Sequence, residues 1–356
     1  MDALSLTKSD WESRLAEWGQ PAYRAGQLLE WIHKRRVADW SEMTNLPAPL
    51  RTRLAGEFPL VRLEKIRETG SRDTTRKFLF RLADGQLIES VLIPASPALY
   101  GEASDRRTIC ISSQVGCAYG CKFCASGLDG WKRNLTAGEI VDQFLRVEAE
   151  SGERINNIVF MGMGEPMANY DNLLRAISIL NAPWGIGVGA RHMTVSTSGL
   201  VPRILDLAAQ PLQVRLAISF HGATDEVRGH IMPVNKKYPV EELLAACEEY
   251  VRKKKQRLTF EYILIRDIND SLDQARLLAR QARRVNAKVN LIPYNTVEGL
   301  DWDRPDESRQ DEFLAVLKNA GAEATLRREK GHDIAAACGQ LRLQVEKSFA
   351  PRAGLN

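Results

Sequence analysis

Three cysteines lie within eight residues, at Cys117, Cys121 and Cys124. This Cys-x3-Cys-x2-Cys spacing brings three sulfur ligands together from one short loop and leaves a fourth coordination position open. Structural zinc sites usually close all four positions with two separated pairs of ligands, whereas an open position can bind a reacting group. The spacing therefore favours an iron–sulfur cluster. A structural zinc site completed by Cys110, Cys338 or a histidine is the alternative.

The segments around this loop alternate between strand and helix patterns. Helical patterns lie between six strand-like segments, at residues 108–113, 157–161, 192–197, 214–219, 258–265 and 288–293. Thr136 and Glu139 form a capping box that marks one helix start, and Pro239 marks another. Because strands that alternate with helices pair in parallel, six βα units in a row predict an α/β fold with a partial or full barrel.

Polar and glycine-rich groups follow the predicted strands. They lie at residues 117–124, 162–166, 196–199, 219–221 and 293–295. In βα barrels the active site lies at the C-terminal ends of the strands. Five such groups at one rim indicate an enzyme rather than a purely structural protein.

Two further units precede the predicted barrel. Apolar residues recur at helical spacing between Trp11 and Trp18. Two strand patterns, at residues 76–82 and 86–93, are joined at Asp84-Gly85, which favours a tight hairpin. The predicted organisation is a helical accessory domain, a β-hairpin extension with a linker, a barrel core and a C-terminal tail, at residues 1–60, 61–107, 108–345 and 346–356.

The composition is typical of a globular protein, with 356 residues of which 44% are hydrophobic and 26% charged. The net charge of +4 is compatible with a nucleic-acid partner but does not establish one. No apolar run reaches 18 residues and residues 1–19 lack a signal-peptide core, so we expect a cytoplasmic protein without a membrane span. Structural disulfides are rare in that compartment, so the six cysteines indicate metal or redox chemistry.

The cysteine spacing, with Phe123 before the last cysteine, resembles that of the radical S-adenosylmethionine superfamily. Within it, several motifs resemble the RlmN/Cfr family: ICISSQVGC (109–117), RNLT (133–136), MGMGEP (161–166), STSG (196–199), MPVN (232–235), NLIPYN (290–295) and AACGQL (336–341). Members of that family methylate one adenosine in the peptidyl-transferase region of 23S ribosomal RNA. The resemblance covers residues 23–341 and implies a partial (βα)6 radical-SAM barrel preceded by a small helical accessory domain and a β-hairpin.

The resemblance implies two cofactors, a [4Fe–4S] cluster and S-adenosyl-L-methionine. Cys117, Cys121 and Cys124 would each bind one iron, and the fourth iron would take the amino and carboxylate groups of S-adenosylmethionine. The residues implied to contact that cofactor are Gly164, Glu165, Ser196, Ser219, Phe220, His221 and Asn295. Considered alone, the polar members of this set would be explained by capping and turn hydrogen bonds at strand ends.

Cys338 is implied to be the methyl acceptor. In the family the matching cysteine takes a methyl group from one S-adenosylmethionine, which suits a thiolate nucleophile. A second S-adenosylmethionine is cleaved reductively, and its deoxyadenosyl radical removes a hydrogen atom from the methylthioether. The carbon radical then adds to an adenine carbon that is not nucleophilic. Considered alone, Cys338 beside Gly339 would be a small buried residue.

Release of the RNA adduct is implied to involve Cys110, which would attack the Cys338 sulfur and leave a transient disulfide. Strand alternation places Cys110 on the opposite side from Ile109 and Ile111, and one of these sides faces the barrel interior. A core cysteine is the alternative. Glu89 matches a proton acceptor of the family, with an exposed strand glutamate as the alternative.

The N-terminal motifs are more similar to RlmN-like than to Cfr-like members. This similarity favours C2 of the adenosine over C8 and allows an anticodon-loop adenosine of transfer RNA as a second substrate. The implied partners are 23S ribosomal RNA, transfer RNA and an electron donor such as a flavodoxin-type reductant, and we expect a monomer. A non-catalytic, zinc-containing RNA-binding protein is the alternative of another class.

Three further features are interpreted more simply. The N-terminal helices carry basic residues and resemble the accessory RNA-binding domain of the family, through Arg24, His33, Lys34, Arg35 and Arg36. The basic run at residues 252–257 is interpreted as solvated side chains at the bottom of the barrel rather than as an RNA contact. Cys247 lies in the middle of a predicted helix and is interpreted as a packed residue.

Overall fold

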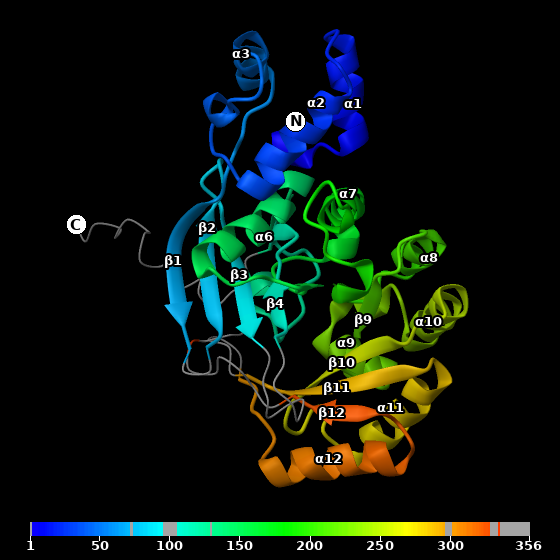
Figure 1. The fold of residues 1–356 in the computed structure, drawn as a ribbon. Coiled ribbons are helices and arrows are strands. Elements are labelled where there is room, and N and C mark those ends of the chain that lie inside the picture. The colour runs from blue at the N-terminus through cyan, green and yellow to red at the C-terminus, as the bar shows by residue number, and fades with distance from the viewer. Residues whose placement is uncertain are drawn as a thin grey trace, which may run out of the picture.

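A ten-stranded sheet forms the framework of the part of the chain that the structure describes (Figure 1). The structure is a computed structural model and describes residues 2–71, 74–94, 105–128, 130–295, 301–327 and 334. Across the sheet the strands follow the order β1 (Glu64–Gly70), β2 (Arg76–Arg81), β3 (Leu87–Pro94), β4 (Arg107–Cys110), β7 (Asn157–Phe160), β8 (Met193–Thr197), β9 (Arg215–Ser219), β10 (Leu258–Leu264), β11 (Ala287–Pro293) and β12 (Ala324–Leu326). A separate small sheet pairs β5 (Gln114–Gly116) with β6 (Trp131–Asn134).

Within the large sheet, β4, β7, β8, β9, β10, β11 and β12 pair in parallel with one another, which is the predicted α/β arrangement. The helices that connect them are α5 (Ala125–Leu128), α6 (Ala137–Ser151), α7 (Tyr170–Asn181), α8 (Val201–Ala209), α9 (Asp225–Ile231), α10 (Val240–Lys254), α11 (Leu272–Arg284) and α12 (Glu307–Asn319). Short helical segments also occur at η4 (Pro166–Asn169), η5 (Ala190–His192) and η6 (Pro233–Lys236). Figure 1 shows the long helices on the outer side of the curved sheet.

The barrel is partial, as the sequence predicts. Within the described residues β12 lies at the edge of the sheet, and β4 pairs with β3 and β7 rather than with β12. The six predicted βα units are present, and β12 adds a short parallel strand that the sequence analysis did not predict. Within the described residues the sheet therefore stays open, with β1 and β12 at its two edges.

The helix starts follow the local sequence. The Thr136 hydroxyl accepts a hydrogen bond from the backbone N–H of Glu139 at 3.1 Å, and the Glu139 carboxylate accepts one from the backbone N–H of Thr136 at 2.8 Å. This reciprocal pair is the predicted capping box at the start of α6. Pro239 occupies the N-cap of α10, one residue before its first turn.

The N-terminal residues form three helices, α1 (Lys8–Glu17), α2 (Tyr23–Leu29) and α3 (Ala48–Glu57), and three short helical segments, η1 (Ala3–Ser5), η2 (Glu30–Arg35) and η3 (Trp40–Glu42). Their core is aromatic, because the Trp11 ring lies 5.1 Å from the Phe58 ring and 6.2 Å from the Trp40 ring, centroid to centroid. The Trp40 indole N–H donates to the Phe58 carbonyl at 2.9 Å. These rings belong to one hydrophobic core that continues into the barrel.

This helical unit is fixed along helix α6. The Arg62 guanidinium donates to the Asp142 carboxylate at 2.8 Å, and the backbone N–H of Leu63 donates to the same carboxylate at 2.7 Å. One turn earlier, near the start of the helix, the Ser5 hydroxyl accepts from the backbone N–H of Gly138 at 2.8 Å. Figure 1 shows the N-terminal helices above α6. The unit is thus held near the start of α6 by Ser5, and near its end by an ion pair between Arg36 and Glu148.

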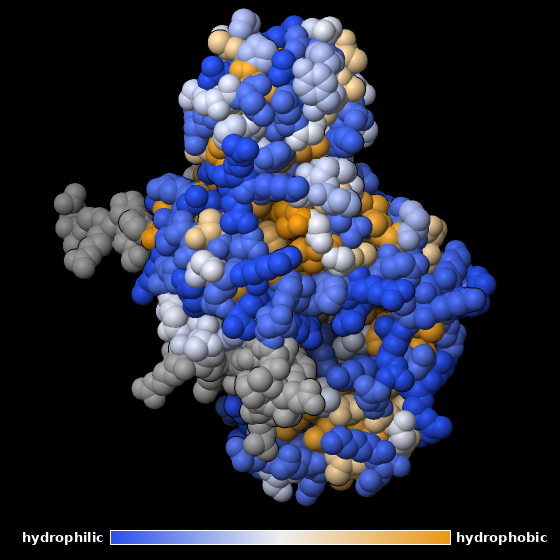
Figure 2. Space-filling model, in the orientation of Figure 1, coloured by the Kyte–Doolittle hydropathy of each residue, from blue (hydrophilic) through white to orange (hydrophobic). Residues whose placement is uncertain are grey.

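The predicted hairpin is formed by β2 and β3, and β1 adds a third antiparallel strand at the edge. Strand β3 pairs antiparallel with β4, so the extension continues the barrel sheet without a break. Figure 2 shows a mostly hydrophilic face with apolar residues in separate small areas. In the part of the chain that the structure describes, no helix combines the length and the apolar character that crossing a membrane requires.

Candidate active site

The cysteine loop follows β5 and is shaped by its own backbone. The backbone N–H of Cys117 donates to the Gly130 carbonyl at 3.0 Å, and that of Cys124 donates to the Cys121 carbonyl at 3.1 Å. Gly116 has a φ of +71°, and a Cβ there would lie 1.9 Å from the Gly130 carbonyl oxygen. Only glycine permits this approach of the two backbones, so the residue before Cys117 is set by packing as well as by conformation.

The three cysteines of the loop line one cavity in the mouth of the barrel, which we call the barrel cavity and which has a volume of about 350 Å³. Burial raises the pKa of the Cys117 thiol to about 12 and also raises the pKa values of Cys121 and Cys124. The Cys117 and Cys121 thiols also lie close enough to the other cysteines for like charge to raise their pKa values further. A positively charged group bound at the loop would reverse this, because metal binding stabilises thiolates.

These residues fit a multi-iron cluster, because three cysteine side chains from one loop line the same cavity. In the described part of the chain, no group of three or more His, Cys, Asp or Glu side chains is arranged to hold one metal ion. In a [4Fe–4S] cluster each thiolate binds a different iron, so the sulfur atoms lie farther apart. Cys110, Cys117, Cys121 and Cys124 all have free thiols, which leaves the three loop cysteines available as ligands.

Gly164 and Glu165 follow β7 and line the same cavity. The Glu165 carboxylate is buried and accepts hydrogen bonds from the backbone N–H of Met167 at 3.0 Å and of Ser198 at 2.7 Å. Burial raises the pKa of this carboxyl, while these hydrogen bonds act in the opposite direction. The carboxylate is therefore occupied in joining the loops after β7 and β8, which leaves the backbone of Gly164 and Glu165 to meet a ligand.

His221 links the cysteine loop to the barrel wall. Its ring lies 4.6 Å from the Phe123 ring in an edge-to-face arrangement, and its Nδ1 accepts from the backbone N–H of Ile263 at 3.0 Å. Burial lowers the pKa of His221 to about 3, so the imidazole is neutral at pH 7. Because Nδ1 is an acceptor, the proton is on Nε2, and the ring can act as a hydrogen-bond donor in the cavity that it lines.

The remaining predicted cofactor contacts lie at the same rim, with one difference. Ser196, Ser219 and Asn295 line the barrel cavity, and the Asn295 Oδ1 accepts from Arg304 at 2.9 Å. The Phe220 ring instead stacks on the Phe260 ring, with 4.4 Å between the ring centroids and 7° between the two planes. Phe220 is not among the residues that line the cavity, and a contact between Phe220 and the cofactor stays a prediction.

Cys110 and Glu89 also line this cavity, although they come from β4 and β3. Ile109 and Ile111 are fully buried in the core, so strand alternation turns Cys110 to the barrel interior as predicted. Glu89 is 4% exposed, so the alternative of an exposed strand glutamate is wrong. Burial raises the pKa of the Cys110 thiol to about 11. Cys338 lies outside the described residues, so its place relative to Cys110 stays a prediction.

The sequence analysis missed Arg228, which ties the ends of β8 and β9 to the segment after α9. This fully buried side chain donates to the carbonyl of Phe220 at 3.1 Å and to the carbonyl of Ser198 at 2.5 Å, and to the Asn235 amide oxygen at 2.9 Å. Burial lowers its pKa to about 10, so it stays charged at pH 7. Asn235 belongs to the MPVN motif, but Arg228 lies in α9 outside any motif. No local pattern marks it.

Three charged residues of the cavity wall were also missed. Lys77 is fully buried, Glu261 is 7% exposed, and Arg327 lines the cavity beside them. Burial raises the pKa of Glu261. A lone glutamate in the otherwise apolar strand pattern at residues 258–265 was the available signal. Lys77 lies in β2 and Arg327 follows β12, so both lie outside the six predicted βα units. The sequence pattern therefore could not place them at the cavity.

Cys247 and the basic run at residues 252–257 lie outside the barrel cavity. Cys247 is fully buried in α10, which confirms that it is a packed residue. In the basic run, Lys254 is buried and donates to the carbonyl of Leu212 at 2.8 Å, so the interpretation of uniformly solvated side chains is wrong there. Arg252 is exposed and pairs with Glu249 at 2.7 Å.

Comparison with known proteins identifies the family. Residues 111–278 match the model of the radical SAM superfamily, and residues 1–59 match that of the ribosomal RNA large subunit methyltransferase N-terminal domain. A probable dual-specificity RNA methyltransferase RlmN of Akkermansia muciniphila is 56% identical over 98% of this chain and 98% of its own length. The chain belongs to the RlmN family.

Other members of the family agree with this assignment. A second RlmN, from Opitutus terrae, is 56% identical over 94% of this chain and 92% of its own length. The crystal structure of a radical SAM methyltransferase from Sphaerobacter thermophilus is 46% identical, with a TM-score of 0.88 over 96% of this chain and 98% of the other. The fold described above is thus that of a radical SAM enzyme.

Membership of the RlmN family decides between the two kinds of metal site. Radical SAM enzymes of this family use a [4Fe–4S] cluster and S-adenosylmethionine, so this chain is an enzyme that uses both. The alternative of a non-catalytic, zinc-containing RNA-binding protein is wrong. The individual contacts between the cavity residues and the two cofactors stay predictions.

The backbone of Gly164 offers a test of the cofactor site. Gly164 has a φ of +94°, and a Cβ there would lie 2.4 Å from the Gln114 Cβ. We expect Gly164→Ala to shift the loop after β7 and to weaken S-adenosylmethionine binding by about tenfold or more, roughly 1.4 kcal/mol. Equilibrium dialysis of the iron-loaded protein under anaerobic conditions measures this affinity.

The matched control is Gly85→Ala, because Gly85 also has a positive φ, of +80°, but an added Cβ meets no atom within 4 Å. This variant carries the conformational cost alone and should bind S-adenosylmethionine like the unmodified chain. Unchanged affinity in a folded Gly164→Ala variant would show that the loop after β7 does not shape the cofactor site.

Proposed function

We propose that this chain methylates carbon 2 of an adenosine in the peptidyl-transferase region of 23S ribosomal RNA, and also an anticodon-loop adenosine of transfer RNA. The similar proteins from Akkermansia muciniphila and Opitutus terrae are named as probable dual-specificity RNA methyltransferases, which supports RNA as the substrate class. The N-terminal domain match to a ribosomal RNA large subunit methyltransferase supports the same class.

One observation carries the proposal, namely that the barrel cavity collects residues from separate segments that this chemistry requires together. The three loop cysteines share the cavity with Cys110, Glu89 and the polar residues at the strand ends. A cavity that only stored a metal would have no need of a fourth thiol and a buried carboxylate beside the cluster loop. Methyl transfer through a cysteine carrier uses both.

The cofactors supply what amino-acid side chains cannot. When bound, the cluster provides single electrons and S-adenosylmethionine provides the methyl group and a reactive radical. The backbone carbonyls of Gly164 and Glu165 are proposed to accept from the ammonium group of the methionine portion. The neutral His221 is proposed to donate through Nε2. Ser196, Ser219 and Asn295 line the rest of the site and are proposed to bind its other polar groups.

A carrier residue is needed because carbon 2 of adenine is not a nucleophile. Cys338 is proposed to hold the methyl group as a thioether and to become covalently attached to the RNA. Cys110 is proposed to release the RNA by attacking the Cys338 sulfur, which leaves a disulfide between the two. Glu89 lines the same cavity as Cys110 and is proposed to accept the proton that leaves the adenine ring.

The proposal also covers organisation and partners. We propose that the accessory domain, hairpin extension, barrel core and tail have the boundaries given from the sequence, at residues 1–60, 61–107, 108–345 and 346–356. The residues that follow β12 would carry Cys338 to the cavity. The enzyme is proposed to act as a cytoplasmic monomer that receives electrons from a flavodoxin-type donor.

The position of the methyl group distinguishes the main proposal from its closest alternative. Ribosomal and transfer RNA from cells with and without this protein should differ by 2-methyladenosine, measured by mass spectrometry of the digested nucleosides. The N-terminal motifs favour this product. 8-Methyladenosine as the main product would instead support a Cfr-like activity, and unchanged RNA in both pools would contradict RNA methylation.

The resolving role of Cys110 has its own test. Cys110→Ala should accumulate protein covalently joined to RNA, seen as a slower band that ribonuclease removes, because no thiol then releases the adduct. Cys247→Ala is the matched control, since Cys247 also has a free thiol but lies outside the cavity. Adding Cys338→Ala to Cys110→Ala should abolish the adduct. Clean turnover by the Cys110→Ala variant would assign release to another residue.

A further inference from the structure

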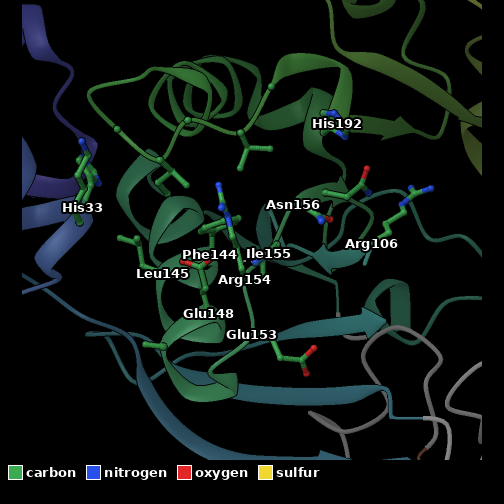
Figure 3. Close-up of a pocket in the computed structure, with 18 of the residues that line it drawn as sticks. His33, Arg106, Phe144, Leu145, Glu148, Glu153, Arg154, Ile155, Asn156 and His192 are labelled. Atoms are coloured by element: carbon green, nitrogen blue, oxygen red, sulfur yellow. Dashed lines mark hydrogen bonds between the residues drawn. The ribbon is translucent and has the colours of Figure 1, made fainter. Parts of the chain in front are cut away.

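A second and larger cavity lies at the opposite end of the barrel strands, and we call it the basal groove (Figure 3). It has a volume of about 980 Å³. One wall is the C-terminal half of α6, and a second is the segment of the N-terminal unit that includes His33, Lys34 and Arg36. The other walls are the segments that enter strands β4, β7, β8 and β9. The groove therefore exists only because the helical unit packs beside the barrel.

The basal groove carries an excess of positive charge. Its lining includes five cations, Lys34, Arg36, Arg106, Arg154 and Arg215, against three carboxylates, Asp105, Glu148 and Glu153. Two of these carboxylates are already neutralised, because Glu148 pairs with Arg36 and Glu153 pairs with Arg107.

Three cations of the groove are available to a ligand. Lys34, Arg154 and Arg215 are exposed, and none of them has an ion-pair partner among the described residues. Figure 3 shows the Arg154 side chain extending into the space between α6 and the loop that precedes β8, whereas the Glu153 side chain points away from it. The positive charge is therefore directed into the groove and the neighbouring negative charge is directed out of it.

An unpartnered buried side chain lies in the same wall. His33 is 2% exposed, and neither of its ring nitrogens has a hydrogen-bond partner within the described residues. Burial lowers the pKa of His33 to about 3, so its ring is neutral and offers one donor and one acceptor. Polar atoms of this kind are normally satisfied by water or by a ligand.

The groove suits a polymer of anions better than a small anion. A site for a small anion usually encloses it with convergent buried donors. Here the free cations are exposed and come from separate elements, which is the arrangement that neutralises successive phosphates along a chain. The arginines can also form bidentate hydrogen bonds with phosphate oxygens.

The position of the groove limits what can reach it. Asn157 at the start of β7 lines the basal groove, and Met161 just after β7 lines the barrel cavity. Four residues of strand span about 13 Å. An RNA that only fills the barrel cavity therefore ends before the groove, and a longer RNA must pass around the side of the barrel to enter it.

We propose that the basal groove binds the phosphodiester backbone of an RNA segment outside the stem-loop that carries the reacting adenosine. This inference rests on the proposed function, since it assumes that the substrate is RNA. Lys34, Arg154 and Arg215 contact the phosphates, and the groove extends the grip on the substrate from the N-terminal unit to the base of the barrel. The contacts favour longer RNAs without reading their sequence.

The test compares a short and a long RNA. The short RNA is a stem-loop with the target adenosine, and the long RNA is a fragment of 23S ribosomal RNA that contains the same stem-loop with its flanking helices. Binding of each to the cluster-loaded protein is measured by fluorescence anisotropy between about 50 and 200 mM salt. The variant is Arg154→Gln with Arg215→Gln. The control is Arg280→Gln with Lys318→Gln, which removes the same charge from exposed positions on α11 and α12.

We expect the groove variant to bind the long RNA about tenfold more weakly at low salt. The slope of log affinity against log salt concentration should become less negative by about 1.5, because the variant has lost two phosphate contacts. Its affinity for the stem-loop and both affinities of the control should stay within about twofold of the unmodified chain. The proposal would be overturned if the groove variant bound the long RNA as tightly as the unmodified chain does. It would also be overturned if the variant lost the same affinity for both RNAs.

Failure of the proposed function would give a different result. Methylation of the stem-loop by the unmodified chain is measured alongside, and its absence would contradict RNA methylation whatever the groove binds. Repeating the titration with an acidic polypeptide in place of RNA checks the choice of partner. A larger effect of the groove variant on the polypeptide than on the long RNA would overturn RNA as the occupant.

Discussion

The arrangement of the site depends on the backbone at Ser198, which the buried side chains of Glu165 and Arg228 hold from opposite sides. The N–H of Ser198 donates to the Glu165 carboxylate at 2.7 Å, and its carbonyl accepts from the Arg228 guanidinium at 2.5 Å. Both side chains are buried, and a buried charge is tolerated only when hydrogen bonds satisfy it. Arg228 also binds the Phe220 carbonyl, so the loops after β7, β8 and β9 form one network. The shape of the barrel cavity follows from this network, because each loop supplies part of its lining.

This network explains how a family of enzymes can place a reactive cluster in an open barrel. The cysteine loop is rigid through its own backbone hydrogen bonds, and the Phe123 ring packs against the His221 ring at 4.6 Å. Burial keeps the three thiols protonated when nothing is bound, as the pKa of about 12 for Cys117 illustrates. A cluster that binds these sulfurs must therefore displace their protons. Burial also raises the pKa of the Cys110 thiol to about 11, so this thiol is protonated at pH 7.

The sequence predicted the features that are local and missed those that tertiary packing creates. The capping box at Thr136 and the alternation around Cys110 are properties of a few consecutive residues, and both are confirmed. The closely spaced cysteines line one cavity, and their role as cluster ligands stays a prediction. Arg228 joins segments that are distant in sequence, so no spacing reveals it. The basal groove is likewise invisible in the sequence, because Lys34 and Arg215 meet only after the helical unit has packed along α6.

The central claim is that residues 117–124 hold a four-iron cluster with one coordination position open to S-adenosylmethionine. Iron and sulfide analysis of anaerobically purified protein, with Mössbauer spectra before and after S-adenosylmethionine is added, tests it most directly. The account predicts about four irons and four sulfides per chain, with one iron whose spectrum changes on addition. A Cys117→Ser, Cys121→Ser, Cys124→Ser variant should lose the iron, and Cys247→Ser should keep it. About one zinc and no iron, or a cluster indifferent to S-adenosylmethionine, would contradict the account.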